Sequence, residues 1–267
     1  MQVTPLIWII TIAVTILFFI YEFFVHVRTP HEPTIGESAR WSAFYISLAL
    51  LFGVGVGTVS GWTYGGEYFA GYLTEKALSI DNLFVFLLVM SAFAVPKIYQ
   101  QKVLMIGIVI ALILRGGFIA VGAALIANLS WIFYIFGALL LVLAYRQAFS
   151  SHETDPSNNR FMRFVRRHLA ITDEYHGDKL TVKKNGKRFV TPMLLTIVAI
   201  GFVDLIFAVD SIPAIYGLTN EAYIVFTANA FALMGLRQLF FLVGGLLERL
   251  VYLAQGLAVI LAFIGVK

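Results

Sequence analysis

The feature that most constrains this chain is a series of long apolar segments. Each has about the 20 residues that a helix needs to cross the hydrocarbon core of a bilayer. The 267 residues are 60% hydrophobic and 13% charged, whereas soluble domains are roughly 45–50% apolar and about 25% charged. We therefore predict an all-α polytopic membrane protein with about eight transmembrane helices. The segments are 5–25, 41–61, 72–95, 102–125, 129–148, 191–216, 221–245 and 249–266.

The polar interruption 149–190 predicts how the chain is oriented. It holds nine of the 19 Lys and Arg residues. If the spans alternate, six more fall on the same side, and the opposite side keeps only Lys76 and Lys267. Because loops rich in Lys and Arg stay in the cytoplasm, we predict an external N-terminus and a cytoplasmic loop 149–190. The net charge of +4 then reflects the orientation of the chain in the lipid bilayer. No nucleic-acid partner is expected.

An internal repeat relates two of the apolar segments. The stretch "EKALSIDNLF" aligns with "DLIFAVDSIP", which sets Glu75 against Asp204 and Asp81 against Asp210. The first stretch would run from outside to inside and the second from inside to outside. This predicts an inverted-topology repeat of three helices each, with a site near the bilayer midplane. The chain then divides into helices 1 and 2 (1–71), repeat 1 (72–148), the basic cytoplasmic loop (149–190) and repeat 2 (191–267).

These four carboxylates are costly inside a bilayer. Insertion scales assign about 2.5–3.5 kcal/mol to an acid at the centre of a helix, so partners or a hydrated cavity must accompany them. Asp81 and Asp210 lie about 120° around an unbroken helix from the acid that precedes each of them. We expect Pro213 to break its helix locally and to reorient Asp210.

Neutral polar side chains share faces with the other two acids. Glu75, Ser79 and Asn82 are spaced at i, i+4 and i+7, which places them on one face of a helix. Asp204 and Ser211 have the same relation in the second segment. Each half of the repeat therefore offers a carboxylate together with hydroxyl or amide oxygens.

Two interpretations are possible for the groups that neutralise these acids. Arg115 and Arg237, each one span downstream of an acidic pair, would form buried ion pairs. Because four carboxylates face two arginines, a divalent cation or a protonated pair would close the remaining deficit. The chain has no Cys, and its five His fall in predicted cytoplasmic loops, so the available ligands are oxygens. Oxygen ligands suit Mn²⁺, Mg²⁺ or Ca²⁺ better than Zn²⁺ or Cu.

Two further polar residues have two interpretations each. Glu22 is either an acid of the ion pathway or a hydrated group at the cytoplasmic boundary. Asn229 either lines the site or makes a hydrogen bond between helices. The predicted metal ligands are Glu75, Asp81, Asn82, Asp204, Asp210 and Ser211, supported by Ser79, Arg115, Arg237, Glu22 and Asn229.

The stretches "GYLTEKALSIDNLFVFLLV", "DLIFAVDSIPAI", "VFTANAFALMGLRQLFF" and "YLAQGLAVILAFIGVK" resemble the TerC/Alx family of integral membrane proteins. This resemblance implies a place in the LysE-type exporter superfamily, an association with manganese(II) efflux and tellurium resistance, and a bacterial cytoplasmic membrane. The family acids map onto the four carboxylates above, and Glu22 in "FFIYEFFVHVR" matches an acid near the end of the first span. Many relatives have Glu where this chain has Gly201, and relatives usually continue beyond "FIGVK".

These observations favour a transporter that exports Mn²⁺, or another hard divalent cation, from the cytoplasm. A proton-coupled or other small-solute transporter is the alternative within transport. A scaffold that hands metal to exported enzymes is a third hypothesis, and an oligomer or a secretion-machinery partner stays open. An enzyme is not expected, because the Asp residues lack the flanking glycine of intramembrane aspartyl proteases and no Ser/His pair lies within the spans. Tellurite is an anion that an acidic site would repel.

Overall fold

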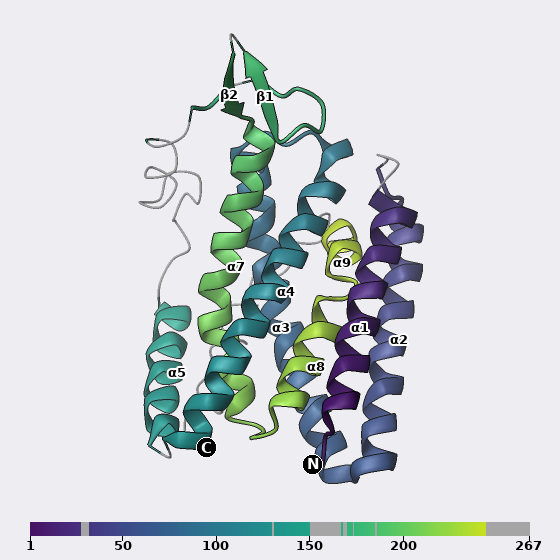
Figure 1. Ribbon diagram of the computed structural model, residues 1–267, viewed down its shortest axis with the longest axis vertical. Coiled ribbons are helices and arrows are strands. Elements are labelled where there is room, and N and C mark those ends of the chain that lie inside the picture. Colours follow the sequence, from purple (N-terminus) through teal and green to yellow (C-terminus); the bar gives the residue numbers. More distant parts are fainter. Residues whose placement is uncertain are drawn as a thin grey trace.

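The fold of this protein, in a computed structural model, is a bundle of long helices with a β-hairpin at one end (Figure 1). The structure describes residues 1–27, 32–129, 131–149, 167, 170–172, 174–184 and 186–243. The side chains of Asp81, Leu143 and 146–149 lie outside this description. The elements are α1 (Pro5–Glu22), continued by the π-helix η1 (Phe23–Val27), α2 (Ile35–Ser60), α3 (Trp62–Ala92), α4 (Lys97–Asn128), α5 (Ile132–Phe149), β1 (Thr181–Lys184), β2 (Lys187–Val190), α7 (Pro192–Tyr216), α8 (Ala222–Leu233) and α9 (Leu236–Val243).

Local sequence explains where the first helices begin and end. The Thr4 hydroxyl accepts a hydrogen bond from the Ile7 amide at the start of α1, and Thr34 does the same for the Glu37 amide at the start of α2. Both threonines satisfy an amide that would otherwise lack a partner in the first turn. Gly61 has a φ of +106°, which favours glycine and separates α2 from α3.

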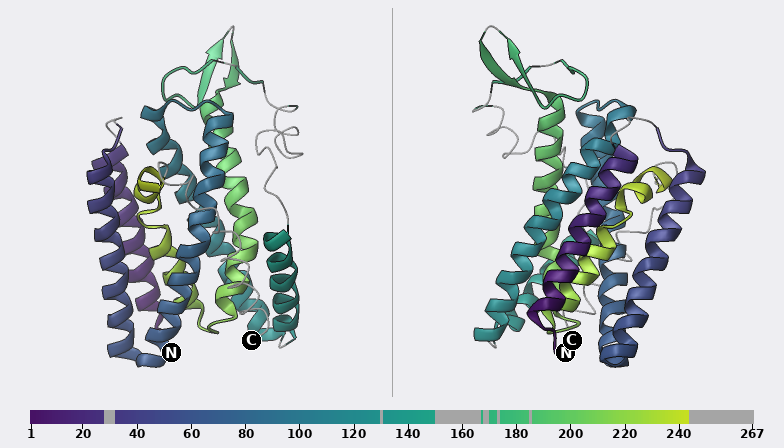
Figure 2. Two further views of the ribbon diagram at one scale, coloured as in Figure 1. Left: turned by 180° about the vertical axis from the view of Figure 1, so that it is seen from behind. Right: turned by 45° about the vertical axis from the view of Figure 1, so that its right-hand side comes forward.

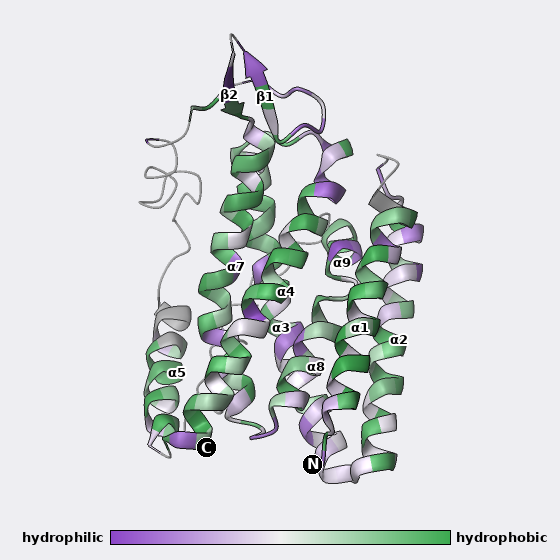
Figure 3. Ribbon diagram, in the orientation of Figure 1, coloured by the Kyte–Doolittle hydropathy of each residue, from purple (hydrophilic) through white to green (hydrophobic). Residues whose placement is uncertain are grey.

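The outer surface of the bundle has the apolar character of a membrane protein. Leu6, Ile9 and Leu17 of α1 are each more than 60% exposed, and the hydropathy colouring shows mainly apolar helices below a hydrophilic hairpin (Figure 3). Among the described residues, α2, α4, α7 and α1 with part of η1 are long and apolar enough to cross a bilayer. These findings confirm the prediction of an all-α polytopic membrane protein.

The number of spans stays a prediction. The 31-residue α3 is not one of the four helices that are apolar enough to cross a bilayer. The apolar part of α5 is short. The segment predicted as one span at 221–245 is instead two helices, α8 and α9, bent by 44°. Gly235 at this break has a φ of +75°, which interrupts the helix. The predicted span 249–266 lies outside the described residues.

Helices of the first predicted repeat pack against helices of the second. The most extensive helix–helix contacts join α4 to α7 and α3 to α8. Helix α3 runs toward the hairpin and α7 runs away from it, and two further views place the hairpin and the N-terminus at opposite ends (Figure 2). We call these the hairpin end and the N-terminal end. Such reciprocal packing of antiparallel helices is what an inverted repeat would produce, although the repeat itself stays a prediction.

The hairpin that precedes α7 is an addition that the helical periodicity does not predict. Thr181 pairs with Val190 and Lys184 with Lys187 in an antiparallel register. Its turn sequence "KKNGKR" carries the Asn-Gly dipeptide typical of tight β-hairpins, and this local signal could have identified it. The hairpin thus gives regular structure to the end of the polar segment 149–190.

Candidate functional site

Arg115 of α4 lies at the centre of a fully buried polar cluster. Its Nε and Nη2 donate to the two carboxylate oxygens of Asp204 on α7, each at 3.1 Å. Its Nη1 donates to Glu75 of α3, to the Ser211 hydroxyl at 3.2 Å and to the Asn229 side-chain oxygen of α8 at 2.9 Å. Three helices therefore supply acceptors to one guanidinium on a fourth, and the two acids that the repeat aligns share one partner.

Two polar atoms of this cluster have no partner among the described residues. They are the second carboxylate oxygen of Glu75 and the hydroxyl of Ser79, one turn further along α3. Both residues are 0% exposed. A buried polar atom without a hydrogen bond is costly, and a carboxylate oxygen is also a strong cation ligand. The site therefore has unused capacity to bind a positively charged group.

A second positive charge lies beside the cluster. Lys76 follows Glu75 in α3, and its ammonium donates to the Ala232 carbonyl at 3.1 Å. Ala232 is in the last turn of α8, just before the break at Gly235. The ammonium thus satisfies a carbonyl near the negative end of a helix dipole. The sequence interpretation missed this role because it placed Lys76 at the external surface.

The predicted helix faces agree with the burial of these side chains. Asn82 is 3% exposed and lies on α3 with Glu75 and Ser79. Asp204 and Ser211 are likewise buried on α7, whereas Asp210 is partly exposed. The Asp81 side chain lies outside the described part of the structure.

The expected break at Pro213 does not occur. Helix α7 continues through Pro213 to Tyr216. A proline removes one backbone hydrogen bond without ending a helix when the surrounding helices hold it. Pro213 therefore does not turn Asp210 onto the face of Asp204, and Asp210 is not among the side chains bonded to Arg115.

The structure separates Arg237 and Glu22 from the Arg115 cluster. Arg237 of α9 donates to Glu22 of α1 at 3.0 Å and to Gln101 of α4. Gln238 donates to the same Glu22 oxygen at 2.8 Å, and the Tyr45 hydroxyl lies 3.4 Å from it. Glu22 is only 2% exposed, so it is not a hydrated boundary group. The prediction that Arg237 serves the acid pairs as Arg115 does is not matched by these contacts.

No three acidic, His or Cys side chains come together as a metal cluster within the described residues. Glu75 and Asp204 are the two acids that converge on Arg115, with oxygens from Ser211 and Asn229 beside them. Asn229 also donates to the Val225 carbonyl within α8. Both earlier interpretations of Asn229 thus find support, since it lines the cluster and bonds between helices.

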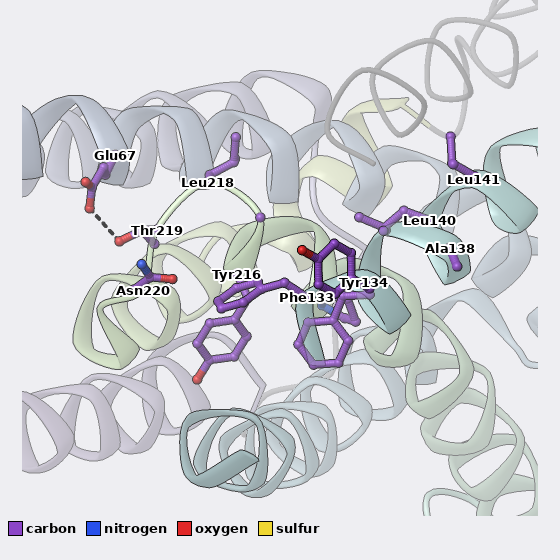
Figure 4. A pocket seen from close by; sticks show the side chains of 14 residues that line it. Glu67, Phe133, Tyr134, Ala138, Leu140, Leu141, Tyr216, Leu218, Thr219 and Asn220 are labelled. Atoms are coloured by element: carbon purple, nitrogen blue, oxygen red, sulfur yellow. Dashed lines mark hydrogen bonds between the residues drawn. The ribbon is translucent and has the colours of Figure 1, made fainter. Parts of the chain in front are cut away.

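A cavity of about 750 Å³ lies at the N-terminal end of the bundle, away from these acids. Figure 4 shows Phe133, Tyr134 and Tyr216 along one part of its wall. Glu67 and Thr219 are joined by a 2.5 Å hydrogen bond at another part. Neither Arg115 nor its acid partners line this cavity. The ion-pair cluster, and not this cavity, is therefore the candidate site.

A bundle of apolar helices with ionisable side chains paired at its centre defines a polytopic membrane protein with an intramembrane polar site. A family model described as "Integral membrane protein TerC family" matches residues 60–267, and the chain belongs to that family.

Curated relatives agree with this assignment. An uncharacterized membrane protein of Mycobacterium tuberculosis is 48% identical over 272 residues, covering 100% of this chain and 68% of its own length. One from Myxococcus xanthus is 38% identical, covering 99% of this chain and 83% of its own length. A protein of Escherichia coli named as a membrane-bound redox modulator, Alx, is 39% identical, covering 99% and 85%. Among solved structures, none matches this chain.

Proposed function

We propose that this protein is a membrane transporter that exports a divalent metal cation, manganese(II), from the cytoplasm. The observation that carries the proposal is the unpartnered oxygen of Glu75, which is fully buried and shares Arg115 with Asp204, together with the unpartnered, buried Ser79 hydroxyl one turn along α3. Two carboxylates and neutral oxygens are the donors that a hard cation prefers. The metal ion is the substrate, and this set of oxygens is its binding site.

Arg115 has a definite role in this proposal. Its guanidinium neutralises Glu75 and Asp204 while no metal ion is bound. An incoming divalent cation would compete with Arg115 for the same oxygens and would displace it from Glu75 first, because Asp204 holds it through two hydrogen bonds. When the ion leaves, Arg115 returns and prevents two buried carboxylates from facing each other without a cation.

Alternating access requires that the site be closed at one end at a time. A packed layer of large apolar side chains lies between the Arg115 cluster and the hairpin end. It includes Leu83, Phe86, Ile108, Ile200 and Val203, which belong to one buried hydrophobic cluster. We place the hairpin end in the cytoplasm of a bacterial cell, with the N-terminus outside, so this layer would close the cytoplasmic route.

The relatives called redox modulators bear on the proposal in one respect. Residues 1–267 contain no Cys, so thiol chemistry of these residues would not underlie a redox role. Export of a redox-active metal ion through oxygen ligands would give such a protein a redox role without any thiol. We do not assign catalysis to the protein.

The test is Mn²⁺ uptake into proteoliposomes that contain the purified chain. Glu75→Gln, Asp204→Asn, Asp81→Asn and Asp210→Asn each remove one charge from the predicted ligand set with little change in shape. The matched control is Glu174→Gln, because Glu174 is a surface acid with a 73% exposed side chain. We expect the control to transport as wild type does and the Glu75 and Asp204 variants to lose flux.

The possible results separate the competing functions. Undiminished flux in both the Glu75 and Asp204 variants would reject the site. Saturable Mn²⁺ binding without flux in wild type would favour a scaffold that hands metal to other proteins. Flux of protons in the absence of any metal would favour the proton-coupled alternative.

A further inference from the structure

A second buried polar cluster lies closer to the hairpin end than the Arg115 cluster. Glu22, Tyr45, Gln101, Arg237 and Gln238 contribute to it from four helices, and their exposed fractions are 5% or less. The cluster resembles the first in one respect. Oxygens of Glu22 and Gln101 converge on the Arg237 guanidinium, as those of Glu75 and Asp204 converge on Arg115. A guanidinium therefore occupies the centre of each oxygen-lined cluster.

The two clusters are separate along the bundle axis. Gln101 and Arg115 are both on α4, and the helical rise of 1.5 Å per residue puts them about 21 Å apart. Met105, Ile108 and Ala111 lie between them on the same helix and are buried. An ion that crossed the protein would therefore meet the Glu22 cluster and the Arg115 cluster at different depths.

Four atoms of the second cluster lack a partner among the described residues. They are Arg237 Nε, Gln238 Oε1, and the hydroxyls of Ser38 and Ser42, and each belongs to a residue that is at least nine-tenths buried. Buried polar atoms are almost always hydrogen-bonded. A protein group, a water molecule or a ligand is therefore needed next to each of them.

A small cavity lies beside three of these four residues. Its volume is about 10 Å³, and it is lined by Ser38, Arg237 and Gln238 together with Gln101. Pro33, Glu37, Trp41 and Phe241 complete the lining. This is about the smallest volume that admits one water molecule. The cavity therefore has room for one species of about the size of a water molecule beside Arg237, near the start of α2.

We propose that Glu22, Gln101 and Gln238 form a second cation site, in which the Arg237 guanidinium occupies the position of a divalent ion. The carboxylate of Glu22, the amide oxygens of Gln101 and Gln238, and the Ser38 hydroxyl are all ligands for a hard cation. With one acid at its centre, the site should bind a cation less tightly than the Glu75–Asp204 pair does. Such an affinity suits a site that an ion occupies only transiently. Its position on the export route rests on the function proposed above, whereas its capacity to bind a cation does not.

Equilibrium binding of Mn²⁺ to the purified protein, followed by electron paramagnetic resonance, tests the site directly. The parent chain carries Asp204→Asn to weaken the first site. Adding Arg237→Met removes the tethered charge and should let the chain bind an additional Mn²⁺ ion. Adding Glu22→Gln to that variant should abolish the gain. Glu174→Gln in the same background is the control, because the Glu174 side chain is 73% exposed and belongs to neither cluster, so the additional ion should stay in place.

A second variant keeps the test valid if Arg237→Met does not fold. Gln238→Glu retains Arg237 and adds a carboxylate beside Glu22, and it should also give an additional bound ion. The proposal is wrong if both variants fold with wild-type helix content and neither binds more Mn²⁺, as expected if the cavity holds water only. It is also wrong if the gain survives Glu22→Gln. If the wild-type protein shows no Mn²⁺ flux while the additional ion is gained and lost as stated, the second site stands and the export function fails.

Discussion

At the scale of single residues, Arg115 is the side chain on which the site depends. It is 0% exposed and bonded to two carboxylates that are themselves buried. Removing one member of a buried ion pair leaves an uncompensated charge, which costs more than the pair itself contributes. The same argument identifies what could replace Arg115, namely another cation bound by the same oxygens.

Arg115→Met should therefore destabilise the protein and make its stability depend on metal. We expect a loss of about 3–5 kcal/mol in the free energy of unfolding. Mn²⁺ at a hundred times its dissociation constant should restore about 2.7 kcal/mol. Thermal unfolding in detergent, with and without Mn²⁺, measures both effects. Arg188→Met on the exposed surface of β2 is the control and should change neither value. An Arg115 variant that Mn²⁺ does not stabilise would argue against a cation site here.

Asp178 gives a pH-dependent contribution outside the membrane-spanning helices. A 2.6 Å hydrogen bond from the Lys102 ammonium, together with its charge, lowers the pKa of Asp178 below its ordinary value of 3.8. Because the folded pKa is the lower one, the pair stabilises the folded state above pH 3.8 and loses this effect as pH falls through the folded pKa. The Asp178 side chain is 49% exposed, so the contribution is at most about 1 kcal/mol.

Asp178→Asn measures this contribution. The difference in unfolding free energy between wild type and variant should be constant from neutral pH down to mildly acidic pH and shrink toward zero in strong acid. High salt at neutral pH should reduce the same difference by screening an exposed pair. A difference that grows as the pH falls would contradict the assignment.

At the scale of elements, the break between α8 and α9 redirects the chain immediately before Arg237. Arg237 follows the break, and α9 packs chiefly against α2. Lys76 donates to the Ala232 carbonyl before the break, so the interrupted helix end is satisfied. A continuous helix over the segment 221–245 would have carried Arg237 along the axis of α8 instead of toward Glu22.

Gly235→Ala should disturb this break. The residue has a φ of +75°, and an added Cβ would lie 2.6 Å from Tyr45 Cδ2. The left-handed conformation costs a non-glycine residue about 1–2 kcal/mol, and the clash with Tyr45 adds to this. Thermal unfolding should therefore show a clear loss of stability. Gly55→Ala within α2 is the control, because nothing lies within 4 Å of its Cβ. Equal stability of the two variants would mean that the break does not depend on Gly235.

At the scale of the whole molecule, the orientation of the bundle in the membrane can be tested with single cysteines, since the chain has none of its own. Lys184→Cys marks the hairpin end and Asn220→Cys the N-terminal end, and both positions are exposed. With a membrane-impermeant thiol reagent, we expect Asn220→Cys to react on intact cells and Lys184→Cys to react only after permeabilisation. The reverse pattern would place the hairpin outside and overturn the predicted export geometry.

The sequence alone determined the class of this protein and predicted which two acids meet in the candidate cluster. Apolar length predicts the helices, because an apolar segment of about 20 residues has few other ways to satisfy its backbone in a bilayer. The aligned acids Glu75 and Asp204 do share one partner, and the helical spacing of Ser79, Asn82 and Ser211 follows from geometry that every α-helix has.

Only the tertiary structure decided which arginine meets which acid. Arg115 and Arg237 look equivalent in the sequence, yet they lie in separate clusters. Arg237 follows the bend at Gly235, and a local change in backbone direction redirects the side chains that follow it. Lys76 and Gln101 gained partners 156 and 136 residues away. Helical periodicity specifies the face on which a side chain lies, but the packing of distant helices determines what that face meets.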